Sequence, residues 1–220
     1  MIYKLIVEHV FICLHNTMRQ SINLEVLVMS FILICSFLFF VVVLRACIQR
    51  IKTGDFGVRM ASPKAPMIEI LPGTIFVLSF GFTLIIVVLN QKGVLPNIYE
   101  LPKHAQWVGF IVGMSGVHFT IISQYQMGNA WRIGVDSDER TALKTKGLYA
   151  KSRNPIYFGI LLFWIGICMT LMHPLLWLCA GVSWWCIELI VRRVEEPYLA
   201  RVHGKTFLQY KNKTNRYLPL

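Results

Sequence analysis

Long apolar runs with almost no charge constrain this chain more than any other feature of its sequence. A helix needs about 20 mostly apolar residues to cross the hydrocarbon core of a bilayer. Five runs reach or approach that length, at residues 24–44, 70–89, 105–123, 156–172 and 174–191. The 220 residues are 55% hydrophobic and only 15% charged, which is too apolar for an ordinary soluble domain. We therefore expect an all-α integral membrane protein with about five transmembrane helices.

The connection between the last two runs is very short. They are separated by little more than His173, and Pro174, which suits the first position of a helix, follows directly. Such a connection predicts that the fourth and fifth spans form a tight antiparallel hairpin whose helices pack side by side. We expect a cytoplasmic helical tail after this hairpin.

Lys and Arg are distributed unevenly, which predicts an orientation. Eighteen of the 22 Lys and Arg residues lie between the first two spans, between the third and fourth, or after the fifth. Cytoplasmic loops of membrane proteins carry the excess of positive charge, so we expect the N-terminus outside and the C-terminus in the cytoplasm. The formal net charge of +11 then indicates the anionic lipid bilayer as a partner rather than a nucleic acid.

The signatures of several soluble enzyme classes are missing from the sequence. It contains no GxGxxG after a strand pattern, no GxxxxGK[ST], no HExxH and no GxSxG. The six cysteines form no CxxC pair and fall almost entirely within apolar runs, which indicates neither a disulfide framework nor a zinc site. We therefore expect no metal ion and no nucleotide-binding domain of the soluble type.

Smaller features of the first half favour structural roles. Gly109, Gly113 and Gly116 follow small-residue spacing along the third span, which favours close helix packing. His118 lies alone in the same span, and we expect a hydrogen-bonded structural histidine. Residues 1–20 are only partly apolar and favour an interfacial helix over a secretory signal.

Most polar residues lie in two segments, 124–155 and 192–220, which flank the predicted hairpin and emerge at the same membrane face. Asn154 and Pro155 suit the start of a helix, whose exposed amides would attract a carboxylate. Glu188 and Glu195 share one face of the last helix, where acids near a membrane span are costly and commonly mark a site. Acids, arginines and tyrosines together would suit a cationic, zwitterionic cofactor.

At these residues the sequence resembles the isoprenylcysteine carboxyl methyltransferase family, including its bacterial branch and the related phospholipid N-methyltransferases. The resemblance rests on Gly147-Leu148-Tyr149 with residues 152–159, on Glu195-Glu196-Pro197-Tyr198-Leu199, and on Gly204, Phe207, Tyr210 and residues 216–219. It departs from the family at Asn154, where the eukaryotic carboxyl methyltransferases have a histidine. Before about Trp131 only the pattern of spans supports it.

The resemblance implies that S-adenosylmethionine binds in a cytoplasmic pocket formed by the loop before the hairpin and the tail after it. Residues 131–220 would then form the methyltransferase core, while residues 1–130 supply the interfacial segment and three transmembrane helices. The candidate cofactor-binding residues are Tyr149, Arg153, Asn154, Pro155, Tyr157, Gly159, Glu195, Glu196 and Tyr210. The candidate catalytic residues are Glu188 and Glu196, as bases for an amine or thiol, and Arg216, which would orient an acidic substrate.

The acceptor should be lipophilic or delivered by the membrane, and the resemblance implies a bacterial inner-membrane enzyme. The carboxylate of a prenylated cysteine, a phospholipid amine, a small thiol and a quinone-like lipid all stay open. Two rival interpretations also remain: an NADPH-dependent membrane sterol or enone reductase, and a five-span scaffold or transporter subunit.

Overall fold

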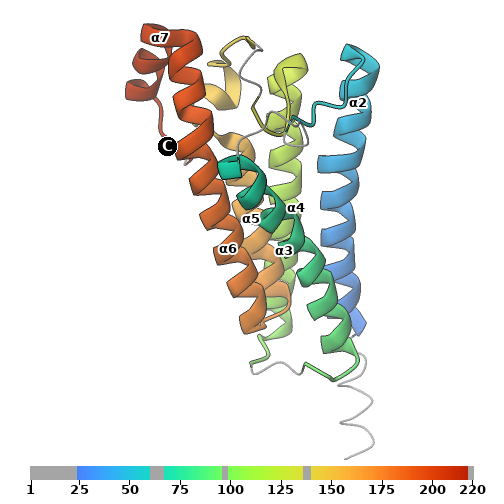
Figure 1. The fold of residues 1–220 in the computed structure, drawn as a ribbon. Coiled ribbons are helices and arrows are strands. Elements are labelled where there is room, and N and C mark those ends of the chain that lie inside the picture. The colour runs from blue at the N-terminus through green and yellow to red at the C-terminus, as the bar shows by residue number, and fades with distance from the viewer. Residues whose placement is uncertain (1–23, 60–66, 96–98, 136–139, 218–220) are drawn as a thin grey trace, which may run out of the picture.

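The computed structural model describes residues 24–59, 67–95, 99–135 and 140–217, which form a bundle of long apolar helices (Figure 1). The first helix runs over Leu24–Thr53 and includes the π-helical stretch η1 (Phe37–Val43) and α2 (Leu44–Thr53). The others in the bundle are α3 (Met67–Gln91), α4 (Lys103–Met127), α5 (Pro155–Thr170) and α6 (Pro174–Ile190). The expected interfacial helix at residues 1–20 lies outside the described residues.

The described residues contain five apolar helices, but these helices are not equivalent. Four are long and apolar enough to cross a membrane, whereas α5 has only 16 residues. The all-α membrane fold is confirmed, and the expected fourth span is shorter than a standard one. A helix of 16 residues is about 24 Å long, which is less than the roughly 30 Å of the hydrocarbon core.

The hairpin between α5 and α6 has the expected short connection, but its helices do not pack chiefly on one another. His173 ends the connection by accepting the amide hydrogen of Leu175 on its Nδ1 at 3.2 Å. Beyond this turn α5 packs chiefly on α4, and α6 packs chiefly on α3. The two helices of the hairpin contact each other, as expected, but each has another helix as its principal neighbour.

Glycines explain why α5 packs on α4. A Cβ atom added to Gly109 would lie 2.6 Å from the Cβ of Met169 and 2.7 Å from the Thr170 nitrogen. One added to Gly166 would overlap the backbone of Gly113. The two backbones approach this closely because neither face carries side chains at these positions, which confirms the packing role expected for the α4 glycines. His118 is also hydrogen-bonded, through Nδ1 to the carbonyl of Met114 at 2.8 Å.

The last helix does not stop at the end of the apolar run. It continues through a π-helical turn, η4 (Val191–Glu195), into α7 (Glu196–Lys213), and it bends at Gly204, whose φ is 51°. Pro197 has no amide hydrogen to donate to the preceding turn, which accounts for the widened turn before α7. Figure 1 shows α7 folded back at the same end of the bundle as the loop that leads into α5.

Backbone hydrogen bonds tie the tail to that loop. The amide of Arg153 donates to the carbonyl of Asn215 at 2.8 Å, and the amide of Asn154 donates to that of Arg216 at 3.0 Å. Segments separated by about 60 residues are thereby joined beside the start of α5. This confirms that the two polar segments share one end of the bundle.

Candidate functional site

A cavity of about 300 Å³ lies at this end of the bundle. Its walls come from η1, α3, the loop before α5, the start of α5, and the region from η4 into α7. The cavity therefore receives residues from both halves of the chain.

One wall of the cavity is apolar and reaches the side of the bundle. Phe37, Val41 and Val42 of the first helix face this space, as do Phe76 and Val77 of α3. Val77 is 60% exposed although it lines the cavity, so the space reaches the surface that contacts lipid in a membrane-embedded protein. An apolar chain could enter from the bilayer between these two helices.

The opposite wall is polar and aromatic. The cations on it are Arg132, Lys144 and Arg153, the acids are Glu69, Glu195 and Glu196, and the phenols are Tyr149, Tyr157, Tyr198 and Tyr210. The Tyr149 hydroxyl donates to the carbonyl of Ser123 at 3.3 Å, and burial raises the pKa of this phenol well above its usual value. Its hydroxyl therefore stays neutral at physiological pH.

Glu196 is the centre of an ion-pair network. Its Oε1 accepts from Arg153 Nη2 at 2.9 Å and from Arg216 Nε at 2.8 Å. Its Oε2 accepts from Arg216 Nη2 at 3.0 Å and lies 3.0 Å from Lys211 Nζ. The carboxylate raises the pKa of the Arg216 guanidinium. Since both oxygens are occupied by cations, Glu196 holds the tail, α7 and the α5 loop together rather than offering a free base.

The Arg153 side chain is likewise held by hydrogen bonds within the protein. Besides Glu196, its guanidinium donates through Nη1 to the carbonyls of Lys211, at 2.9 Å, and Thr214. Its Nε is buried and has no hydrogen-bond partner among the described residues. Most of its donors therefore already bind the protein.

Glu195 and Tyr157 form the second acidic contact of the wall. The Tyr157 hydroxyl donates to Glu195 Oε1 at 2.5 Å, which joins the start of α5 to η4. Both side chains line the cavity. Unlike Glu196, Glu195 forms no ion pair with the residues that the structure describes, so its second oxygen is better placed to meet a ligand.

The start of α5 faces the cavity, although Asn154 does not cap it. Asn154 occupies the N-cap position, but its side chain makes no capping bond and instead donates to the carbonyl of Arg216 at 3.2 Å. The expected start of the helix at Asn154 and Pro155 is confirmed, although the Asn154 side chain contacts the tail and not the first turn. The amides of Ile156 and Tyr157 have no partner within the helix, as is usual in a first turn, and both residues line the cavity.

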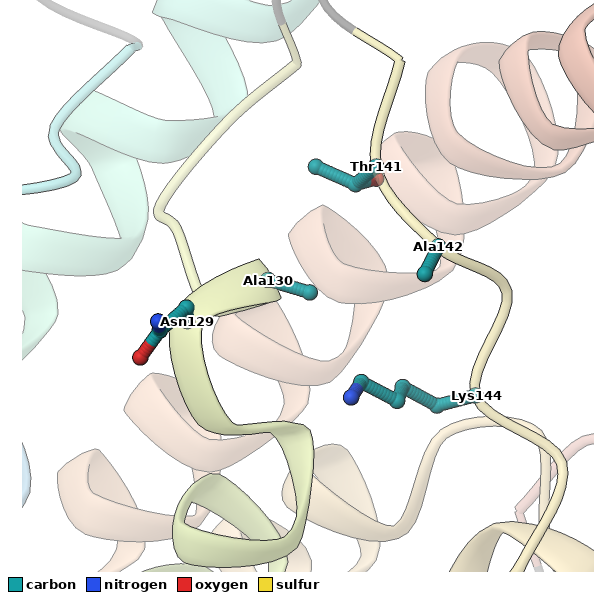
Figure 2. Close-up of a pocket in the computed structure, with 5 residues that line it drawn as sticks. All are labelled: Asn129, Ala130, Thr141, Ala142 and Lys144. Atoms are coloured by element: carbon teal, nitrogen blue, oxygen red, sulfur yellow. The ribbon is translucent and has the colours of Figure 1, made fainter. Parts of the chain in front are cut away.

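The mouth of the cavity lies between two stretches of the loop. Figure 2 shows Thr141, Ala142 and Lys144 on one stretch and Asn129 and Ala130 on the other, with the Lys144 side chain extending across the gap toward Ala130. Arg132 stands nearby and donates through Nη2 to the Tyr198 hydroxyl at 2.8 Å. The first helix supports this loop, since Arg45 donates to the carbonyl of Gly128 at 2.6 Å.

Most of the predicted site residues line this one cavity. They are Tyr149, Arg153, Asn154, Pro155, Tyr157, Glu195, Glu196 and Tyr210. Gly159 lies instead in the contact with α4, where an added Cβ would lie 2.9 Å from the Gly116 oxygen. Glu188 pairs with Arg192, and Arg216 reaches the site only through Glu196. These three residues lie outside the lining.

Glu69, Arg132, Lys144 and Tyr198 also line the cavity and were not predicted. The sequence held a signal for Glu69, because it is an acid placed directly before an uncharged run, and acids at the ends of membrane helices are costly. No local pattern distinguishes Arg132 or Lys144 from other loop cations. Their position depends on how the loop folds over the helix ends.

The lining fits a ligand that carries both signs of charge. Loop cations and the amides of α5 can meet a carboxylate, while the acids and the faces of the tyrosines can meet an ammonium or a sulfonium. The apolar wall leads from this polar end to the lipid-facing surface. A charged small molecule and an amphiphile could therefore occupy adjoining parts of one cavity.

Comparison with known proteins points to methyltransferases. Residues 104–206 match the family model described as phospholipid methyltransferase. A protein-S-isoprenylcysteine O-methyltransferase of Dictyostelium discoideum is 27% identical over 117 residues, which are 51% of this chain and 48% of that protein. The chain thus spans about half the length of this curated relative.

The fold also has a solved counterpart. The structure of the eukaryotic intramembrane Ras methyltransferase, an isoprenylcysteine carboxyl methyltransferase, superposes with a TM-score of 0.50 at 18% sequence identity. The match covers 80% of this chain and 60% of the other. At this identity the likeness concerns the fold alone.

Proposed function

We propose that this protein is a membrane-embedded methyltransferase that uses S-adenosylmethionine, because residues 104–206 match the phospholipid methyltransferase family model and the chain is distantly similar to an isoprenylcysteine methyltransferase. Enzymes of this family take their methyl group from S-adenosylmethionine. The observation that carries the proposal for this chain is the single cavity, in which a polar wall suited to that cofactor adjoins an apolar wall open to the side of the bundle.

The residues that would hold the cofactor follow from its charges. Its carboxylate would lie at the start of α5, near the Ile156 and Tyr157 amides, with Lys144 at the mouth as a counter-ion. Glu195 would accept from its ammonium or its ribose hydroxyls, since it has an oxygen left after the bond from Tyr157. Tyr149 and Tyr210 would offer aromatic faces to the adenine or the sulfonium. Glu196 and Arg153 would support this wall from behind.

Methyl transfer needs alignment and exclusion of water more than acid or base chemistry. When bound, S-adenosylmethionine supplies an electrophilic methyl group on a positively charged sulfur. The chain's own task is to hold an acceptor in line with that methyl group. The contact between tail and loop would hold the polar wall in place, and the apolar wall beside the lipid would keep water from the acceptor.

We propose a lipophilic or membrane-delivered acceptor, whose apolar part would enter between the first helix and α3. The exposed cavity residues Val42 and Val77 support this route, since they combine contact with the cavity and contact with the surface. The proposed orientation has the cavity on the cytoplasmic side, where S-adenosylmethionine is made. The distribution of Lys and Arg supports this orientation.

Ligand titration of the purified protein tests the proposal. S-adenosylhomocysteine, the product form of the cofactor, should bind with a single-site isotherm, and NADPH should not compete with it. Tight binding of NADPH with no response to S-adenosylhomocysteine would contradict the proposal and favour a reductase. A variant with Tyr125→Phe serves as a control, because Tyr125 is 79% exposed and lies outside the cavity lining.

A further inference from the structure

One face of α3 combines a buried acid with an apolar track. Glu69, Gly73, Phe76 and Val77 follow one another at helical spacing, and all four line the cavity. Gly73 leaves room along the helix because it has no side chain. The track runs from the buried carboxyl of Glu69 to the exposed side chain of Val77, which is the arrangement that an amphiphile with one polar end would match.

The Glu69 carboxyl is buried, and one of its two oxygens accepts a hydrogen bond from a described residue. The residue is 1% exposed, and its Oε1 accepts the amide hydrogen of Val135 at 2.8 Å. Its Oε2 has no hydrogen-bond partner among the described residues. A buried carboxylate oxygen without a partner is costly, and a ligand that donates a hydrogen bond would remove that cost.

The charges around Glu69 disfavour an anion. Glu195, which lines the same cavity from η4, interacts electrostatically with Glu69, and the Arg132 cation acts on both. Arg132 already donates to Tyr198 and, at 3.3 Å, to Thr141. Lys144 stands at the loop mouth, and Arg153 is bound to Glu196. Two acids facing one engaged cation would repel a carboxylate and attract an ammonium.

We propose that Glu69 binds the nucleophilic end of the methyl acceptor and selects an amine rather than a carboxylate. This inference rests on the proposed methyltransferase function and names its substrate class, an amphiphilic amine. The apolar part of the acceptor lies along Gly73 and Phe76, and its nitrogen donates to Glu69 Oε2. The acid therefore distinguishes this chain's acceptor from the isoprenylcysteine carboxylate indicated by the names of its relatives.

The proposed methyl transfer needs a proton acceptor, and the Glu69 carboxylate supplies it. The acceptor enters as an ammonium and gives one proton to the Glu69 carboxylate. The nitrogen lone pair then forms the new bond to the methyl carbon, while the pair of the broken carbon–sulfur bond stays on sulfur as a neutral thioether. The product is an N-methyl ammonium ion, and the proton on Glu69 passes to water.

The first test uses the wild-type protein in detergent with a methyl-labelled donor and three acceptors. Dodecylamine and phosphatidylethanolamine should accept label, and dodecanoate should not. The two amines distinguish a free aliphatic amine from a lipid headgroup as the source of the same chemistry. Preferential labelling of dodecanoate overturns the inference, and so does the failure of both amines while S-adenosylhomocysteine still binds. Loss of S-adenosylhomocysteine binding would instead contradict the proposed function itself.

The second test compares Glu69→Gln with Glu25→Gln, an exposed acid paired with Lys103 at 2.8 Å. Glutamine can still accept from Val135 but cannot take a proton. We expect kcat/KM for dodecylamine to fall about 10- to 100-fold in Glu69→Gln, mainly through KM, with S-adenosylhomocysteine affinity unchanged. Glu69→Asp should recover part of the loss, and Glu25→Gln should behave as wild type. An unchanged kcat/KM in Glu69→Gln overturns the inference. If that variant does not fold, the wild-type comparison of amines with dodecanoate decides.

Discussion

At the scale of single residues, neighbouring acids in the motif have different surroundings. Glu195 accepts one hydroxyl, from Tyr157, whereas Glu196 is surrounded by three cations. The adjacent side chains point into different environments because they follow a helical turn. Equal roles for the two acids are therefore not expected, and separate predictions follow for each.

Tyr157→Phe removes the hydroxyl that orients Glu195. We expect S-adenosylhomocysteine affinity to fall by about 1 to 3 kcal/mol, the usual effect of losing a hydrogen bond to a charged group. Isothermal titration calorimetry would measure it, with Tyr125→Phe as the matched control. An unchanged affinity would remove the Tyr157–Glu195 pair from the proposed cofactor site.

We expect Glu196→Gln to affect the stability of the fold more than it affects ligand binding. It leaves Arg153, whose side chain is 9% exposed, and Arg216 without their counter-charge. We expect the free energy of unfolding to fall by about 3 to 5 kcal/mol, because a buried charge loses its partner. Glu25→Gln, which breaks the exposed pair with Lys103, should cost less than about 1 kcal/mol. Thermal unfolding in detergent compares the two, and equal losses would contradict the role given to Glu196.

At the scale of helices, the position of the start of α5 depends on close packing against α4. Gly113 and Gly166 face one another with no room for a side chain, whereas nothing lies within 4 Å of a Cβ atom built on Gly181 in α6. The same contact carries Tyr157 at the start of α5 toward η4. Displacement of α5 would therefore disturb the site as well as the core.

Gly166→Ala and Gly181→Ala provide a matched pair of helix substitutions. The first should lower the melting temperature and weaken S-adenosylhomocysteine binding, because an overpacked contact costs about 1 to 3 kcal/mol. The second should leave binding unchanged and raise stability slightly, since alanine favours a helix over glycine by about 1 kcal/mol. Differential scanning fluorimetry and titration would distinguish them. Tolerance of Gly166→Ala in both measurements would contradict the tight α4–α5 contact.

At the scale of the whole molecule, the polar loop, the tail and the cavity share one end of the bundle, and α3 ends at the opposite end (Figure 1). The bundle thus presents all of its cavity-lining charges to one side of a membrane. If the proposed orientation holds, that side faces the cytoplasm.

Cysteine labelling in intact cells tests this orientation. In a background without the six native cysteines, Lys92→Cys should react with an impermeant maleimide from outside, and Lys146→Cys should react only after permeabilisation. The reason is that these residues lie in connections on opposite sides of the predicted bilayer. The reverse pattern would contradict a cytoplasmic cavity.

Local patterns in the sequence were enough to predict the helices, the short turn at His173, the glycine face of α4 and the gathering of both polar segments at one end. These properties depend on hydropathy and on the preferences of neighbouring residues. Tertiary structure alone assigned Glu196 to an ion-pair network, bonded the Asn154 side chain to the tail and brought Glu69 to the cavity. Those outcomes depend on contacts between residues 20 to 66 positions apart, including Arg216 with Glu196 and Glu69 with Val135. Such contacts form only when whole helices pack, so no local pattern can specify them.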